Sequence, residues 1–241
     1  FSGIFSLIQI FVAMNPEETI YFANPGPGGV FNNKFYFHWE DFNNEIVNDW
    51  EKIADQFLSI PMAHQLIGFY TVPDETDGIL KVMRSYQYYA ASRISDVVSR
   101  TDWESKRDDK GGYIWHTTGS GKTMTSFKAA QLIANSKDAD KVVFLMDRIE
   151  LGTQSLLEYR GFADDSDEVQ STESTEVLKN KLLSPNPSDT LIVTSIQKMS
   201  RLKRGETLTN LEAEKLNKKR IVVIIDECHR SVFGDSLITI R

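Results

Sequence analysis

The chain has 241 residues, 41% hydrophobic and 25% charged, which is enough apolar material for a full buried core. Its formal net charge of −7 argues against a protein that coats nucleic acid indiscriminately. A single cysteine excludes an internal disulfide framework and suits the reducing cytoplasm, and no run approaches the ~20 apolar residues of a membrane span. We therefore expect a globular, cytoplasmic protein with no membrane contact.

The first segment predicts a pair of strands. Ile4–Ala13 and Thr19–Ala23 are apolar runs on either side of an Asn15-Pro16 turn. The chain begins at Phe1 rather than at a methionine. We interpret residues 1–37 as the C-terminal tail of an incomplete upstream domain.

The next segment predicts helical structure. Apolar residues between Ile46 and Phe57 recur at the spacing of one helix face. We interpret residues 38–80 as a helical linker.

From about Lys81 onward, strand and helix patterns alternate in the manner of a parallel sheet with helical crossovers. The fold class predicted for residues 81–241 is α/β, a parallel sheet with flanking helices. The predicted strands are Gly112–Trp115, Val142–Met146, Thr190–Val193 and Ile221–Ile225.

A glycine-rich loop follows the first of these strands and precedes a helical pattern. Gly119 and Gly121 allow successive backbone N–H groups to approach phosphate oxygens closely. Lys122 would place a positive charge on the β- and γ-phosphates, and the Thr123 hydroxyl would bind Mg²⁺. The residues predicted to bind ATP are Thr117, Thr118, Gly119, Ser120, Gly121, Lys122 and Thr123.

This loop departs from the strict P-loop fingerprint at one position. His116 stands where the fingerprint has its first glycine, so the motif is present in a relaxed form. The alternative is a chance Gly/Ser/Thr turn before a helix. The flanking strand and helix patterns favour the phosphate loop.

Two acids follow the last predicted strand. Asp226 stands at the carboxyl end of Ile221–Ile225, where open α/β sheets bind ligands, so it would hold Mg²⁺ together with Thr123. Glu227 would orient or deprotonate the attacking water. The alternative is that the two acids lie in an exposed turn. The phosphate loop earlier in the sequence favours the nucleotide site over this alternative. The predicted catalytic residues are Lys122, Asp226 and Glu227.

Polar residues also follow two other predicted strands. Asp147-Arg148 and the run Thr194 to Gln197 would lie at the same edge of the sheet as the ATP site. Their side chains suit contacts to nucleic-acid phosphates rather than base reading, and ordinary loop residues are an equally good interpretation.

The set of motifs resembles the first motor domain of superfamily 2 helicases, a RecA-like P-loop fold. The stretches IWHTTGSGKTMTSFKAA, DRIELGTQ, SIQKM and IDECHRSVFG resemble more closely the restriction (HsdR) subunit of type I restriction-modification enzymes. The stretch QIFVAMNPEETIYFANP resembles the part of that subunit just after its endonuclease core.

The resemblance implies an ATP- and Mg²⁺-dependent translocase of double-stranded DNA, whose full subunit cleaves DNA together with methyltransferase and specificity subunits. It implies that Gln87 recognises adenine. It further implies that the DNA-facing residues are Arg148, Gln154, Thr194, Ser195 and Gln197.

The same resemblance sets limits on the fragment. Nuclease residues are expected before Phe1, and a second motor domain after Arg241, so these 241 residues alone should have little activity. Two alternatives remain open. One is another superfamily 2 DNA or RNA helicase, and the other is a non-catalytic docking fragment with a vestigial ATP loop.

Overall fold

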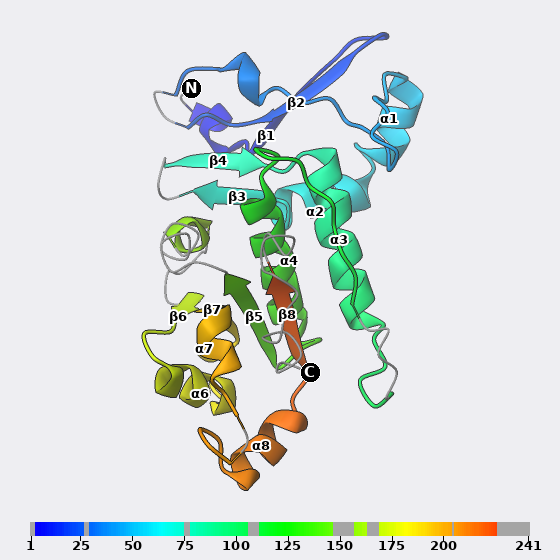
Figure 1. Cartoon of the computed structure of the whole chain (residues 1–241). Coiled ribbons are helices and arrows are strands. Elements are labelled where there is room, and N and C mark those ends of the chain that lie inside the picture. Colours follow the sequence, from blue (N-terminus) through cyan, green and yellow to red (C-terminus); the bar gives the residue numbers. More distant parts are fainter. Residues whose placement is uncertain are drawn as a thin grey trace. The chain divides into compact units, whose positions relative to one another are not determined.

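The computed structural model describes residues 3–26, 29–74, 78–105, 111–146, 157–162, 169–203 and 205–225. The chain divides into two compact units, Phe1–Arg93 and Ile94–Arg241. Figure 1 labels the elements of both, and helix α3 (Ser85–Ser99) runs through the division.

The first unit contains two antiparallel hairpins, β1 with β2 and β3 with β4, together with short helices. Its elements are η1 (Gly3–Leu7), β1 (Ile10–Met14), β2 (Thr19–Ala23), η2 (Asn33–Phe35), α1 (Trp50–Gln56), α2 (Ile60–Gly68), β3 (Thr71–Asp74), β4 (Ile79–Val82) and the first part of α3.

The first predicted strand is half right. Residues Ile10–Met14 form β1 and pair with β2, but Gly3–Leu7 form a 3-10 helix. The reason is the buried Asn24, whose side-chain nitrogen donates to the carbonyls of Phe5 at 3.1 Å and Ile8 at 2.7 Å. A side chain therefore satisfies backbone acceptors that a strand would have paired with a neighbour.

The predicted helix around residue 50 is shorter than expected. The Asp49 carboxylate accepts hydrogen bonds from the amides of Glu51 and Lys52 and so fixes the start of α1 at Trp50. Ile46 therefore lies outside the helix, and Trp50 is half exposed. The buried residues of this region are Ile53 and Phe57, and Phe57 packs on Tyr21 and Trp39.

The second unit is an α/β structure built on a four-stranded parallel sheet with the order β6-β7-β5-β8. Its elements are α4 (Lys122–Ser136), β5 (Lys141–Met146), β6 (Val169–Ser171), α6 (Thr175–Leu183), η4 (Pro187–Asp189), β7 (Leu191–Ser195), α7 (Ile196–Ser200), α8 (Asn210–Asn217) and β8 (Ile221–Ile225). The predicted fold class, a parallel sheet with flanking helices, is confirmed.

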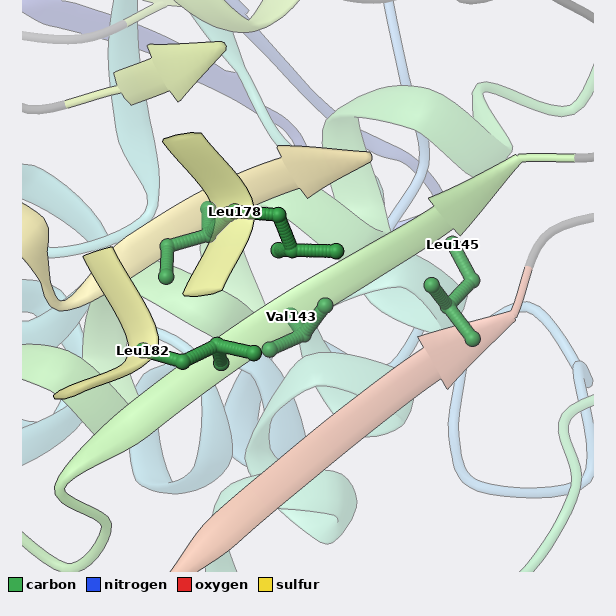
Figure 2. Packing of buried hydrophobic residues seen from close by; sticks show 5 residues of the cluster. Val143, Leu145, Leu178 and Leu182 are labelled. Atoms are coloured by element: carbon green, nitrogen blue, oxygen red, sulfur yellow. The ribbon is translucent and has the colours of Figure 1, made fainter. Parts of the chain in front are cut away.

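Strand β5 is buried on both faces, because its side chains alternate between two helical layers. Val143 and Leu145 pack with Leu178 and Leu182 of α6 and with Ile192 of β7 (Figure 2). On the opposite face, Phe144 contacts the ring of Tyr159 at 4.6 Å between centroids, and Tyr159 in turn contacts Phe127 of α4 at 5.3 Å. The sheet is thus fixed between α6 and α4.

One of the strands predicted for this unit is not found. Residues Gly112–Trp115 are described but form no strand, and Tyr113 and Trp115 are 86% and 87% exposed. These two side chains are therefore not buried by any part of the chain that the structure describes. The predicted strand Ile221–Ile225 is β8, which pairs with β5 and has half-buried side chains.

An ion pair joins β8 to the start of β5 at the amino edge of the sheet. Arg220 donates from its guanidinium and its backbone amide to the Asp140 carboxylate, at 2.9 Å and 2.7 Å, and these bonds lower the pKa of Asp140. Next to it, Lys141 donates to the Asp189 carbonyl at 2.7 Å, and burial lowers the pKa of this ammonium to about 8.

Across the described ranges, every helix is too short or too polar to cross a membrane.

The core between β5 and α6 makes a stability prediction. Leu178→Ala removes a side chain that is fully buried against β5, so we expect it to lower the free energy of opening by about 2–5 kcal/mol. Leu211→Ala on α8, where the side chain is 63% exposed, should change it little. Hydrogen exchange at the β5 amides of the full-length protein measures both. Equal exchange rates in the two variants would contradict this view of the core.

Candidate functional site

The phosphate loop enters α4 through two glycines with left-handed backbone. Gly119 has φ +76°, and Gly121, the residue that caps α4, has φ +75°. A side chain at either position would cost about 1–2 kcal/mol through backbone strain. His116 is absent from the residues with positive φ, so the loop has no need of a glycine there. The departure from the strict fingerprint therefore has a physical explanation.

Hydrogen bonds within the loop hold its turn. The Ser120 hydroxyl donates to the Thr117 carbonyl at 2.7 Å, and the Ser120 amide reaches the same oxygen at 3.3 Å. His116 Nδ1 lies 3.0 Å from Ser120 Oγ, and it is the donor because the hydroxyl proton is already committed to Thr117. Sequence reasoning treated His116 only as a departure from the motif, although a serine four residues later was the available signal.

The first turn of α4 is suited to binding an anion. Gly121 offers no side-chain cap, and the hydrogen bond from the Thr125 amide to the Gly121 carbonyl, at 3.1 Å, opens the helix. The capping residue therefore has no side chain that could occupy this end, and the helix dipole favours negative charge there. Lys122 and Thr123 occupy this turn and are half-buried.

The loop lies toward the carboxyl end of the sheet. Only four residues, 137–140, connect the end of α4 to the start of β5, so the two elements run antiparallel. The 15 residues of α4 extend ~22 Å at 1.5 Å each. The six residues of β5 extend ~20 Å at 3.3 Å each. The first turn of α4 is thus level with the last residues of β5.

The strand ends at this edge are level with one another. Leu145 pairs with Thr194 of β7 and with Ile225 of β8. Asp226 and Glu227 follow Ile225 directly in the sequence, and both lie outside the described residues.

The DNA-facing residues predicted in this unit fall into two groups. Arg148 and Gln154 lie outside the described residues. Thr194 and Ser195 are the last residues of β7 and are buried. Thr194 Oγ1 accepts from the Thr172 hydroxyl at 2.8 Å, and Ser195 Oγ caps α7 by accepting from the Lys198 amide at 3.3 Å.

Gln197, in the first turn of α7, is exposed, unlike Thr194 and Ser195. Of the three predicted DNA-facing residues that the structure describes, Gln197 alone presents its side chain to solvent.

Gln87 lies in the other unit, in the first turn of α3. Its side-chain oxygen accepts from the Arg84 amide at 2.9 Å, and the residue is 5% exposed. The Arg84 guanidinium stacks on the Phe37 ring, 4.5 Å from the centroid. Gln87 therefore caps a helix here, and its contact with adenine remains a prediction.

Within the residues that the structure describes, no group of three or more His, Cys, Asp or Glu side chains is placed to hold a metal ion. That Thr123 and Asp226 hold Mg²⁺ together with the phosphates of a nucleotide remains a prediction.

The sequence matches a known protein family over the part of the chain that carries these features. Residues 86–241 match the family model described as SWI2/SNF2 ATPase. The match includes the phosphate loop, all strands of the parallel sheet and the Asp226-Glu227 pair.

Curated relatives are similar over nearly the whole chain. A type I restriction enzyme endonuclease subunit of Staphylococcus aureus is 40% identical over 98% of this chain and 24% of its own length. One of Staphylococcus saprophyticus is 38% identical over the same shares. The chain spans about a quarter of the length of these relatives.

A shorter relative is covered almost completely. The C-terminal part of the type I restriction enzyme MpnIIP endonuclease subunit, from Mycoplasma pneumoniae, is 42% identical over 81% of this chain and 94% of its own length.

The backbone geometry of the glycines predicts that a glycine-to-alanine substitution has different effects on nucleotide binding at Gly119 and at Gly112. An added methyl group has open space at both Gly119 and Gly112, but only Gly119 has a positive φ. Gly119→Ala should weaken binding of a fluorescent ATP analogue by the full-length subunit roughly tenfold, from backbone strain. Gly112→Ala should leave the affinity unchanged. Equal affinities in the two variants would contradict the role assigned to this loop.

Proposed function

Because the chain belongs to the SWI2/SNF2 ATPase family and to the endonuclease subunits of type I restriction enzymes, we propose that it supplies the first motor domain of a DNA motor and the ATP-binding residues of that domain. In this proposal the full subunit hydrolyses ATP with Mg²⁺, moves double-stranded DNA and cleaves it. Residues 81–241 are the first RecA-like motor domain. Residues 1–37 end an endonuclease domain, and residues 38–80 link the two.

The observation that carries the proposal is the geometry of the phosphate loop. Two left-handed glycines lead into an uncapped helix end, and that helix packs against the sheet with its first turn level with the strand ends. Such a helix end binds phosphate through backbone N–H groups and its dipole. The residues present therefore fit a nucleoside triphosphate.

Each residue of the loop has a distinct task in this proposal. The amides from Thr117 to Gly121 surround the phosphate oxygens, and the Lys122 ammonium balances charge on the β- and γ-phosphates. Thr123 and Asp226 hold Mg²⁺, which neutralises charge that develops on the phosphates. Glu227 orients the attacking water or accepts its proton.

The proposed DNA contact is to the sugar-phosphate backbone. Gln197 is exposed beyond the carboxyl end of β7, at the sheet edge that also carries the phosphate loop. An amide side chain there can bond phosphate oxygens of any sequence, as a translocase requires. Arg148 and Gln154 would join it, whereas the buried Thr194 and Ser195 would support this surface from within.

The choice of DNA site falls outside these residues. We propose that methyltransferase and specificity subunits of the same system supply it and that the complex works in the cytoplasm. The names of the relatives, all endonuclease subunits of type I restriction enzymes, support this assembly.

Lys122 provides the first test. In the full-length subunit assembled with its partners, Lys122→Ala should lower ATP turnover at least ~100-fold, because a positioned charge on the transferred phosphate is lost. Lys215→Ala, an exposed lysine on α8, is the matched control and should retain turnover. Unchanged hydrolysis by the Lys122 variant would place the nucleotide site elsewhere.

The nucleic-acid requirement separates the proposal from another helicase. ATP turnover of the same assembly should rise when duplex DNA with an unmethylated target is added, because the proposed motor tracks duplex DNA. Single-stranded RNA and methylated duplex serve as comparisons. Equal stimulation by RNA, or no response to the duplex, would reject the restriction-motor function.

A further inference from the structure

A chain of hydrogen bonds begins at the phosphate loop and ends in the core. The Ser126 hydroxyl donates to the backbone carbonyl of Thr123, in the first turn of α4, at 3.0 Å. Ser126 Oγ also lies 2.7 Å from the hydroxyl oxygen of Tyr159. Because a serine hydroxyl has a single proton and gives it to Thr123, Tyr159 is the donor to Ser126. The order of donation is therefore Tyr159 to Ser126 to Thr123.

Tyr159 is held in a fixed position by its surroundings. The residue is fully buried, and its ring packs on Phe144 of β5 and on Phe127 of α4. Phe162, from the same segment 157–162, contacts Phe127 at 5.8 Å. The rings of Phe144 and Phe127 fix the Tyr159 ring, whose hydroxyl lies within hydrogen-bond distance of Ser126.

We propose that Tyr159 is a positioning residue for the nucleotide site, acting through Ser126 on the first turn of α4. The inference rests on the proposed function, because Thr123 and Lys122 in that turn are the residues assigned to Mg²⁺ and phosphate. Tyr159 itself touches no nucleotide. Its hydroxyl holds the Ser126 side chain in one rotamer. Ser126 in turn donates to the Thr123 carbonyl and so holds the backbone of the first turn of α4.

The bond from Ser126 to the Thr123 carbonyl carries a cost for the helix. A serine that donates to a carbonyl three residues earlier competes with the regular helix bonds and tends to bend the helix. Without Tyr159 as donor, the Ser126 oxygen would lose a partner in a half-buried environment and the side chain could rotate. The head of α4 would then sample more orientations, and the preorganised phosphate site would weaken.

The test compares Tyr159→Phe with Ser126→Ala in the full-length subunit. Tyr159→Phe removes the hydrogen bond to Ser126 and should raise the dissociation constant of a fluorescent ATP analogue with Mg²⁺ about fivefold, the effect of one hydrogen bond. Ser126→Ala also removes the bond to the Thr123 carbonyl and should raise it at least as much. The double variant should bind no more weakly than Ser126→Ala alone, because the bond between Tyr159 and Ser126 can be lost only once. The KM for ATP should rise in parallel while kcat stays near that of the unsubstituted subunit.

A matched control is available on the same helix. Ser136, in the last turn of α4, also donates to a carbonyl three residues earlier, the carbonyl of Ile133 at 3.2 Å. Ser136→Ala should leave the dissociation constant unchanged. A merely structural role for Tyr159 would lower the melting temperature of Tyr159→Phe without changing nucleotide affinity.

Three results would overturn the proposal. They are unchanged affinity in Tyr159→Phe, additive effects in the double variant, and an equal loss in Ser136→Ala. None of these results would contradict the proposed function if Gly119→Ala weakens nucleotide binding and Lys122→Ala stops hydrolysis. Failure of those two variants would instead reject the nucleotide site itself.

Discussion

The burial of β5 on both faces is the constraint on which the candidate site depends. Val143 and Leu145 require a cover on one side, which α6 provides, and Phe144 requires a cover on the other, which α4 and Tyr159 provide. A helix held in this way has a fixed end. The two glycines with positive φ then direct the chain into that end, and in the proposed function the backbone amides there bind phosphate.

The long periodic elements were predictable from the sequence because one physical effect dominates each of them. The apolar spacing of α4 and the apolar runs within β5, β7 and β8 reflect packing against neighbouring elements. Two of the misses, in the first strand and in α1, occur where a single polar side chain decides the local structure. Asn24 satisfies the carbonyls of Phe5 and Ile8, and Asp49 starts α1 later than the apolar pattern suggests. Such single hydrogen bonds produce no periodic pattern of apolar residues in the sequence.

The glycines of the candidate loop could be identified from the sequence, but the contacts that support the loop could not. Gly119 and Gly121 could be identified from sequence because few residues tolerate their backbone conformation. The donation from Tyr159 to Ser126 joins residues 33 positions apart, so no local pattern reveals it. Thr194 and Ser195 show the opposite error. They were expected at the surface because they follow an apolar run, whereas the strand continues through both and buries them.

The central claim is that the backbone from Thr117 to Thr123 binds the phosphates of ATP. Amide hydrogen exchange of the full-length subunit, measured with and without a non-hydrolysable ATP analogue and Mg²⁺, tests it most directly. The account predicts slower exchange at amides of this loop when the analogue is bound, because phosphate oxygens accept hydrogen bonds from them. Unchanged exchange in this loop at saturating analogue, with protection confined to other parts of the chain, would contradict it.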